Sequence, residues 1–182
     1  MLRVIAGKYR GRKIVTGKHL AARPTMSIVR EAIFNMLSSK KPIYNLNVLD
    51  LFCGSGSFSF EALSRGAKHA FMVDSDYYNL QLPKKTAEDF GIADHVTLIC
   101  CSANKLPQPT SKCDVVFIDP PYNSNLVHST LDRLAHSGWL SNDSLIILEI
   151  RKNEDFECNK NFSVILERTY GIARIIFLSL ST

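Results

Sequence analysis

The chain is 182 residues long, with 46% apolar and 21% charged residues, which is typical of a soluble globular protein. This length suits one well-buried domain with a small appendage rather than two full domains. No apolar run approaches the roughly 20 residues of a membrane span, and the N-terminus lacks the long apolar segment of a secretion signal. We therefore expect a cytoplasmic, monomeric protein with no membrane partner.

Cysteine and histidine indicate neither a disulfide framework nor a metal site. The five cysteines are an odd number without C-x-x-C spacing, and they lie mostly in apolar runs, where a buried thiol behaves as a small hydrophobe. The five histidines are scattered without the spacing of metal ligands. We predict that the protein binds no metal.

Positive charge is concentrated at the N-terminus. Residues 1–30 hold eight of the 22 Lys and Arg and no acid, whereas the rest of the chain holds 14 basic and 17 acidic residues. A solvated face or a flexible basic tail would explain this run equally well on charge alone. However, "LRVIAG" and "RKIVTG" are strand-like and flank "KYRG", so the pattern predicts a folded β-hairpin over residues 1–24. A basic appendage indicates a nucleic acid partner, because Lys and Arg neutralise phosphates and release counterions.

From residue 25 to residue 182 the chain alternates helical and strand patterns. An amphipathic helix is expected at 25–40, with Thr25 as its N-cap, followed by helices at 57–66, 77–91 and 126–136. Strands are expected at 46–52, 68–74, 95–101, 113–119, 143–150, 162–169 and 173–180.

This alternation predicts an α/β fold with a mainly parallel sheet, because the strands read as near-continuous apolar runs. The last two strands are joined by "YG" without a helix, so we expect them to form an antiparallel hairpin at one edge. Pro83 should kink or split the helix at 77–91, since proline lacks a backbone donor.

The first strand leads into a glycine-rich turn, "VLDLFCGSGS", that opens the next helix. Asp50 stands at the strand end, while Gly54 and Gly56 allow a sharp bend and close approach of a ligand. Asp74 ends the next strand, 24 positions later, where a carboxylate can accept hydrogen bonds from ribose. Ser59 replaces the third glycine of the pyrophosphate fingerprint, and Asp50 would repel a phosphate. S-adenosylmethionine, with a cationic sulfur and one carboxylate, therefore fits better than a dinucleotide.

The sequence "DPPY" follows the apolar strand "CDVVFI". Two prolines stiffen the loop and remove two backbone donors, so carbonyls and the Asp119 carboxylate remain as acceptors. Tyr122 supplies a flat face for stacking. This combination suits a planar base with an exocyclic amino group, which must be flipped out of a duplex or already single-stranded.

Together these stretches resemble the RsmD family of bacterial methyltransferases, which act on a guanine N2 of 16S ribosomal RNA. The resemblance is carried, in the same order over essentially the whole chain, by "RVIAGKYRGRKI", "ARPT...VREAIFN", "DLFCGSG", "DPPY" and the closing "YG". D-P-P-Y alone indicates amino-group methylation and is shared with DNA adenine enzymes, whereas the N-terminal stretches are more specific. The resemblance implies a Rossmann-like class I methyltransferase fold, with a seven-stranded sheet whose last strand is antiparallel.

The resemblance also implies the residues of each site. The chemistry would depend on Asp119, Pro120 and Tyr122. The cofactor would be held by Asp50, Phe52, Gly54, Gly56, Asp74 and Ser102. The RNA would be held by Lys8, Arg10, Arg12, Lys13, Arg23, Thr25 and Arg30. Ser102 departs from the family, which usually has an Asp there for the adenine amino group; because a hydroxyl accepts less strongly than a carboxylate, we expect weaker cofactor binding.

The expected activity is methyl transfer from S-adenosylmethionine to a guanine N2 of 16S ribosomal RNA, in the small subunit or its assembly intermediate. Two alternatives remain. An adenine-N6 DNA or RNA methyltransferase would use the same D-P-P-Y, but such DNA enzymes normally need a sizeable target-recognition region, for which this chain has no spare length. A non-catalytic RNA-binding assembly protein would need the basic hairpin, but its function would not require the glycine turn or D-P-P-Y.

Overall fold

The computed structural model describes residues 1–17, 24–121 and 126–181. The strands are β1 (Asn47–Leu51), β2 (His69–Asp74), β3 (Val96–Cys100), β4 (Cys113–Ile118), β5 (Leu140–Arg151), β6 (Phe162–Tyr170) and β7 (Ala173–Leu180). The helices are α1 (Pro24–Lys40), α2 (Ser57–Ser64), α3 (Tyr77–Phe90) and α4 (Leu126–His136), with short 3-10 turns η1 (Ala93–His95) and η2 (Ala103–Lys105). None of the helices within these ranges is both long and apolar enough to span a membrane.

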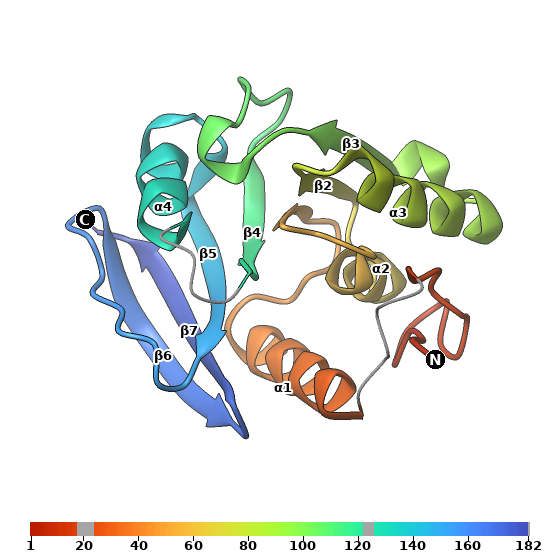
Figure 1. Cartoon of the computed structure of the whole chain (residues 1–182), viewed down its shortest axis with the longest axis horizontal. Helices are drawn as coiled ribbons and strands as arrows, with labels where there is room; N and C mark the ends of the chain where they lie inside the picture. The colour runs from red at the N-terminus through yellow and green to blue at the C-terminus, as the bar shows by residue number, and fades with distance from the viewer. Residues whose placement is uncertain (18–23, 122–125, 182) are drawn as a thin grey trace.

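The strands form one seven-stranded sheet in the order β3-β2-β1-β4-β5-β7-β6 (Figure 1). The first five strands are parallel, as expected for strands connected through helices. The last strand, β7, pairs antiparallel with β5 and with the edge strand β6. The predicted mainly parallel sheet with an antiparallel last strand is therefore confirmed.

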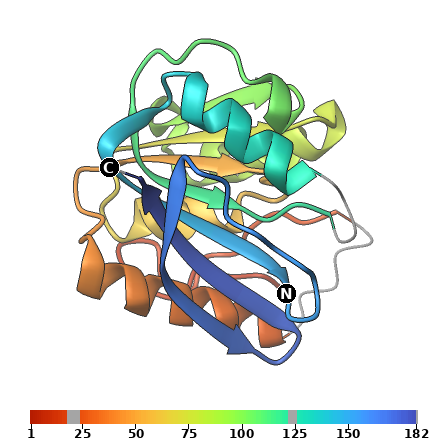
Figure 2. The same cartoon turned by 90° about the vertical axis from the view of Figure 1, so that its left-hand side faces the viewer.

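Each face of the sheet has its own apolar core, because the central strands are buried on both sides. Helices α1, α2 and α3 cover one face and α4 covers the other; Figure 2 shows the sheet between α1 and α4. On the first face, Phe58 of α2 stacks between Phe34 of α1 and Phe117 of β4, with ring centroids 4.8 and 4.2 Å apart. On the second face, Trp139 packs edge-on against Phe71, with ring centroids 5.2 Å apart.

Helix α3 continues through Pro83, so the expectation that this residue splits the helix is wrong. Two well-formed ends stabilise the helix. At the N-terminus the Asp76 carboxylate accepts a hydrogen bond from the Tyr78 amide (2.8 Å), and at the C-terminus Gly91 adopts a left-handed conformation. Pro83 itself is buried, and its packing offsets the missing backbone hydrogen bond.

Residues 1–17 form two extended arms joined by a turn. The Val4 amide donates to the Arg12 carbonyl (3.1 Å) and the Ile14 amide donates to the Leu2 carbonyl (3.0 Å), but only one antiparallel bridge forms in this segment. Leu2, Val4 and Ile14 are buried in the core beneath α1 and α2. The segment is thus hairpin-like and packs on the rest of the protein, while the division of the chain at residue 24 stays a prediction.

The buried carboxylate of Glu61, on α2, anchors this segment. It accepts hydrogen bonds from the amides of Ile5 (2.7 Å) and Ala6 (3.0 Å) and from Arg65 Nε (2.8 Å). Arg30 Nε of α1 lies 3.8 Å from the second carboxylate oxygen. Glu61 is 0% exposed, so its negative charge is fully buried. The hydrogen-bond donors and the two guanidinium groups offset the cost of burying this charge.

We predict that Glu61→Gln lowers the free energy of unfolding by about 3–5 kcal/mol, because it leaves the buried Arg30 charge without its partner. Urea unfolding measures the change. Glu31→Gln, on the exposed face of α1, is the matched control and should stay within about 0.5 kcal/mol of the wild type. Equal stability of the two variants would contradict the anchoring role of Glu61.

Candidate active site

Acidic side chains gather where the parallel strands end. Asp50 lies in β1, Asp74 ends β2, Asp119 follows β4 directly and Glu149 lies near the end of β5. The strands that carry these acids are parallel, so their carboxyl ends lie at the same edge of the sheet. For example, Leu51 near the end of β1 pairs with Ile118 at the end of β4. The carboxyl ends of parallel strands are where open α/β sheets bind their ligands, so this edge is the candidate site.

The turn after β1 contains two glycines in different surroundings: Gly56 is closely surrounded by other atoms, whereas Gly54 borders open space. Both adopt left-handed conformations, with φ of 50° at Gly54 and 70° at Gly56. A Cβ at Gly56 would lie 2.9 Å from Met72 Sδ and 3.2 Å from Pro83 Cβ, so no side chain fits there. A Cβ at Gly54 would meet nothing within 4 Å. Gly54 therefore presents bare backbone to open space, as a site for a closely bound cofactor requires.

Phe52 has a φ of 63°, which is strained for a bulky residue. Its ring packs against the core on the α4 side of the sheet. The strained residue sits between β1 and the open glycine, at a position predicted to contact the cofactor. That contact stays a prediction.

The carboxylate of Asp74 holds the turn in place. It accepts hydrogen bonds from the amides of Gly54 (3.0 Å) and Asp76 (2.9 Å) and from the side-chain amide of Asn79 (3.3 Å). Asp74 is thereby brought next to the glycine turn, as the spacing in the sequence predicted. Each carboxylate oxygen can accept more than one hydrogen bond, so Asp74 retains acceptor capacity for a ribose hydroxyl.

Asp50 supports the turn from inside the protein. Its side chain is 2% exposed and accepts hydrogen bonds from the Ser59 hydroxyl (2.7 Å) and the Ser59 amide (3.3 Å) in the first turn of α2. Burial raises the pKa of Asp50 to about 7, with smaller contributions from the charges of Asp119 and Asp74. Direct contact between Asp50 and a cofactor stays a prediction, because in this structure its carboxyl serves the turn.

Asp119 and Pro120 lie beside this turn, at the end of β4. The Asp119 amide lies 3.5 Å from the Leu51 carbonyl, which ties the D-P-P segment to the end of β1. Burial raises the pKa of Asp119, and Pro120 is buried. Tyr122 lies outside the described residues, so its stacking role stays a prediction.

Ser102 lies just beyond β3, next to the end of β2, where the Cys101 amide donates to the Asp74 carbonyl (3.1 Å). The Ser102 hydroxyl donates its single proton to Asn104 Oδ1 (2.8 Å). The lone pairs of the hydroxyl oxygen therefore stay available as acceptors. A contact between Ser102 and an adenine amino group stays a prediction.

Glu149 is the site residue that the sequence interpretation missed. It stands within the apolar run "LIILEI" of β5, where it reads as part of a buried strand. Burial raises its pKa, and the charge of the neighbouring Asp119 raises it further. An acid inside an otherwise apolar parallel strand was the available signal, because such a residue is unfavourable there unless it serves a site.

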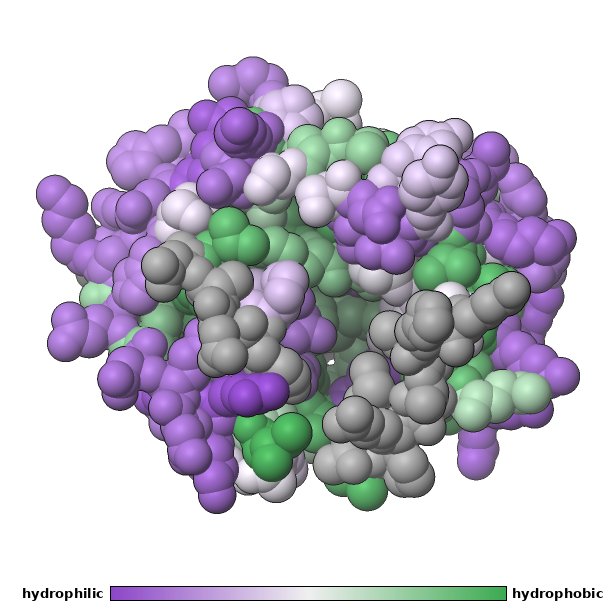
Figure 3. Space-filling view, in the orientation of Figure 1, coloured by the Kyte–Doolittle hydropathy of each residue, from purple (hydrophilic) through white to green (hydrophobic). Residues whose placement is uncertain are grey.

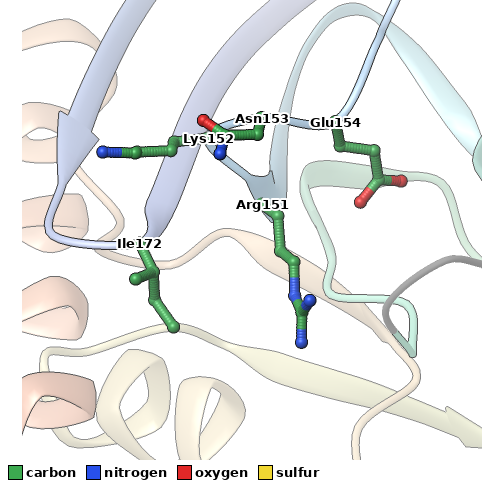
Figure 4. A pocket seen from close by; sticks show the side chains of 5 residues that line it. All are labelled: Arg151, Lys152, Asn153, Glu154 and Ile172. Atoms are coloured by element: carbon green, nitrogen blue, oxygen red, sulfur yellow. The ribbon is translucent and has the colours of Figure 1, made fainter.

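A cavity of about 460 Å³ lies at the end of β5, lined by Arg151, Lys152, Asn153, Glu154 and Ile172 (Figure 4). Along the strand order, it lies on the side of Asp119 away from the glycine turn. Figure 3 shows that the face of the molecule seen in Figure 1 is hollowed near its middle. Open space thus lies next to Gly54, and a cavity lies at the end of β5.

The basic residues at the N-terminus divide into two groups. Lys8, Arg10, Arg12 and Lys13 are all exposed, but Arg12 in addition donates to the carbonyls of Asp89 and Phe90 in the last turn of α3. The guanidinium of Arg12 also lies 4.2 Å from the centre of the Phe90 ring. Arg12 therefore caps a helix in addition to carrying charge.

The expectation that Arg30 contacts RNA is corrected by its burial. Arg30 is 5% exposed and donates to the Arg3 carbonyl (2.6 Å) besides facing Glu61. It stabilises the N-terminal segment instead. Arg23 and the Thr25 side chain lie outside the described part of the chain, so their RNA contacts stay predictions.

We predict that Asp50→Asn stabilises the protein at high pH. An acid whose pKa is higher in the folded than in the unfolded state lowers stability as the pH rises from about 4 to about 7, because the folded state binds the proton more tightly. Asparagine keeps an oxygen for Ser59, so the variant should gain on the order of 1–4 kcal/mol at about pH 8 and little at about pH 4. Urea unfolding at both pH values tests this. A pH-independent difference would show that Asp50 is not protonated preferentially in the folded state.

Comparisons with known proteins identify the family of the chain. Residues 2–179 match the family model Conserved hypothetical protein 95. The ribosomal RNA small subunit methyltransferase D of Haemophilus influenzae is 35% identical over 178 residues, covering 94% of this chain and 90% of the relative. The match extends over both the N-terminal segment and the sheet.

Solved structures share the same fold. The Escherichia coli protein yhhF, described as a candidate methyltransferase, has a TM-score of 0.85 and 29% identity and covers 98% of this chain and 97% of that chain. Magnesium protoporphyrin IX methyltransferase from Synechocystis, solved with bound S-adenosylmethionine, has a TM-score of 0.64 and 18% identity, covering 86% of this chain and 80% of that chain, a likeness of fold alone. The chain belongs to the Conserved hypothetical protein 95 family, that of the ribosomal RNA small subunit methyltransferases D, and is a methyltransferase.

Proposed function

We propose that this methyltransferase transfers a methyl group from S-adenosylmethionine to the exocyclic N2 of a guanine in 16S ribosomal RNA of the small subunit. The observation that carries the proposal is the position of Asp119 and Pro120 beside the open glycine turn, with Leu51 and Ile118 in register. This arrangement supports the proposal, because acceptors for an amino group would then lie next to the candidate cofactor site. The name of the Haemophilus influenzae relative supports ribosomal RNA of the small subunit as the substrate.

The described residues fit this cofactor. Gly54 leaves open space over the backbone, and Asp74 retains acceptor capacity for the ribose hydroxyls. Ser102 can accept a hydrogen bond from the adenine amino group. When bound, S-adenosylmethionine supplies a methyl group on a cationic sulfur.

The chain contributes mainly positioning to the reaction. The Asp119 carboxyl and the Pro120 carbonyl accept hydrogen bonds from the amino group of the base, which turns the nitrogen lone pair toward the methyl group. The two prolines hold these acceptors rigidly, since their φ angles are fixed. A well-oriented pair of reactants lowers a barrier by as much as about 7–11 kcal/mol. The nitrogen becomes acidic as it gains the methyl group and releases one proton to water.

Transfer of label from S-adenosylmethionine tests the proposal, using unmodified small ribosomal subunits and duplex DNA as substrates, followed by digestion to nucleosides. We expect N2-methylguanosine from the subunits and no label in DNA. Asp119→Asn keeps one acceptor oxygen and should retain measurable turnover, whereas Asp119→Ala should be inactive, and both should bind the cofactor in calorimetry. N6-methyladenine, or no transfer to either substrate, would overturn the proposed activity; equal inactivity of the two variants would overturn the acceptor role of Asp119.

The exposed basic residues of the N-terminal segment should supply RNA affinity. Replacing Lys8, Arg10 and Lys13 with Gln should weaken binding to small subunits and reduce the slope against log salt by up to about one unit for each phosphate that is no longer neutralised. Affinity for S-adenosylmethionine should stay the same. The matched control replaces three exposed lysines elsewhere with Gln: Lys105, Lys112 and Lys160. An equally large weakening in the control would mean that net charge, rather than this segment, attracts the RNA.

A further inference from the structure

Two carboxyl groups stand side by side at the candidate site, on adjacent strand ends. Ile118 of β4 pairs with Leu148 of β5, and the next residues along these strands are Asp119 and Glu149. Side chains alternate between the faces of a strand, so both acids point to the face opposite Ile118 and Leu148. This is the face that carries α1 and α2, where Phe117 and Ile147 are buried.

These two partly buried acids lack the donors that Asp50, Asp74 and Glu61 have. The Asp50 carboxylate accepts from Ser59, Asp74 accepts from three groups and Glu61 from two amides and Arg65. In residues 1–17, 24–121 and 126–181, the structure records no hydrogen bond to the side chain of Asp119 or Glu149. Burial raises the pKa of both groups, and the charge of Asp119 raises the pKa of Glu149 further. A ligand with two neighbouring N–H donors would relieve this unfavourable pair, since hydrogen bonds favour the charged form of a carboxyl.

The Watson–Crick edge of guanine carries such a pair of donors, at N1–H and the N2 amino group. Adenine instead presents one amino donor beside an unprotonated N1, which is an acceptor. We propose that Glu149 accepts a hydrogen bond from N1–H of the target guanine while Asp119 accepts one from its N2 amino group. Glu149 would then be the residue that selects guanine over adenine at a D-P-P site, and this inference rests on the function proposed above.

A cavity begins two residues beyond Glu149 on the same strand. Glu149 and Arg151 project to the same side of β5, and Arg151 lines the cavity of about 460 Å³ at the end of this strand (Figure 4). The cavity is also lined by Lys152, Asn153, Glu154 and Ile172, so its wall offers both hydrogen-bonding groups and an apolar surface to a base. A base entering from this side would reach Glu149 and Asp119 before it reached the glycine turn.

A base analogue that keeps the amino group but lacks N1–H tests the proposal. Once the methylated guanine has been located in the labelling experiment, small subunits are reconstituted with 2-aminopurine at that single position. At about pH 8.5, above the pKa of about 8 to which burial and the charge of Asp119 raise Glu149, the wild-type enzyme should methylate 2-aminopurine roughly 10- to 100-fold more slowly than guanine, because the ionised Glu149 carboxylate then faces an unprotonated N1. Glu149→Gln can donate its amide N–H to that nitrogen, so its preference for guanine should fall to within about threefold. Glu157→Gln, an exposed acid-to-amide change on the connection between β5 and β6, should keep the wild-type preference.

The outcomes separate this inference from the function on which it rests. If the wild-type enzyme forms no N2-methylguanosine in small subunits, the proposed function fails and the inference fails with it. If the wild-type enzyme methylates guanine but Glu149→Gln keeps the wild-type preference over 2-aminopurine, the inference alone is overturned. The Glu149→Gln protein is first shown to bind S-adenosylmethionine as the wild type does, so that a change in preference reports on the base and not on the fold.

Discussion

The position of the N-terminal segment relative to the sheet depends on the hydrogen bonds and ion pairs of the buried Glu61 carboxylate. This carboxylate joins the backbone of residues 5 and 6 to α2, and through Arg30 to α1. The same helix begins at the glycine turn, where Asp50 holds its first turn through Ser59. One short helix therefore connects the N-terminal segment at one end to the cofactor turn at the other. Because residues 1–17 are already packed on the protein, the RNA binding proposed for this segment would not have to fold it, which would remove an entropic cost.

The features that the sequence predicted well are those set by local pattern. Parallel strands buried on both faces must read as continuous apolar runs, so β1 to β5 were visible without any knowledge of their neighbours. Gly54, Gly56 and Asp74 were recognisable for a similar reason, since they belong to one strand-turn-helix-strand unit. Asp119 was marked by the two prolines that follow it.

The features that the sequence did not predict are those set by contacts between distant segments. Glu149 can be recognised as a candidate site residue only once it is known to lie beside Asp119. That proximity depends on the register of β4 against β5. Arg30 was grouped with the exposed basic residues because its buried partner, Glu61, lies 31 positions away in another helix. The prediction that Pro83 splits the helix was wrong because it considered only the low helix propensity of proline. It did not take into account the capping residues and the packing that stabilise α3.

The gathering of acids at the strand ends also bears on how the enzyme releases its product. Asp50, Asp74, Asp119 and Glu149 give this edge a negative potential whenever they are ionised. Such a field attracts a sulfonium cation but has no comparable hold on the neutral thioether that remains after methyl transfer. A cofactor bound at this edge, as proposed above, would lose the attraction of its sulfonium charge in the chemical step itself. The product would then be held less tightly than S-adenosylmethionine, which would favour its exchange for a new cofactor molecule.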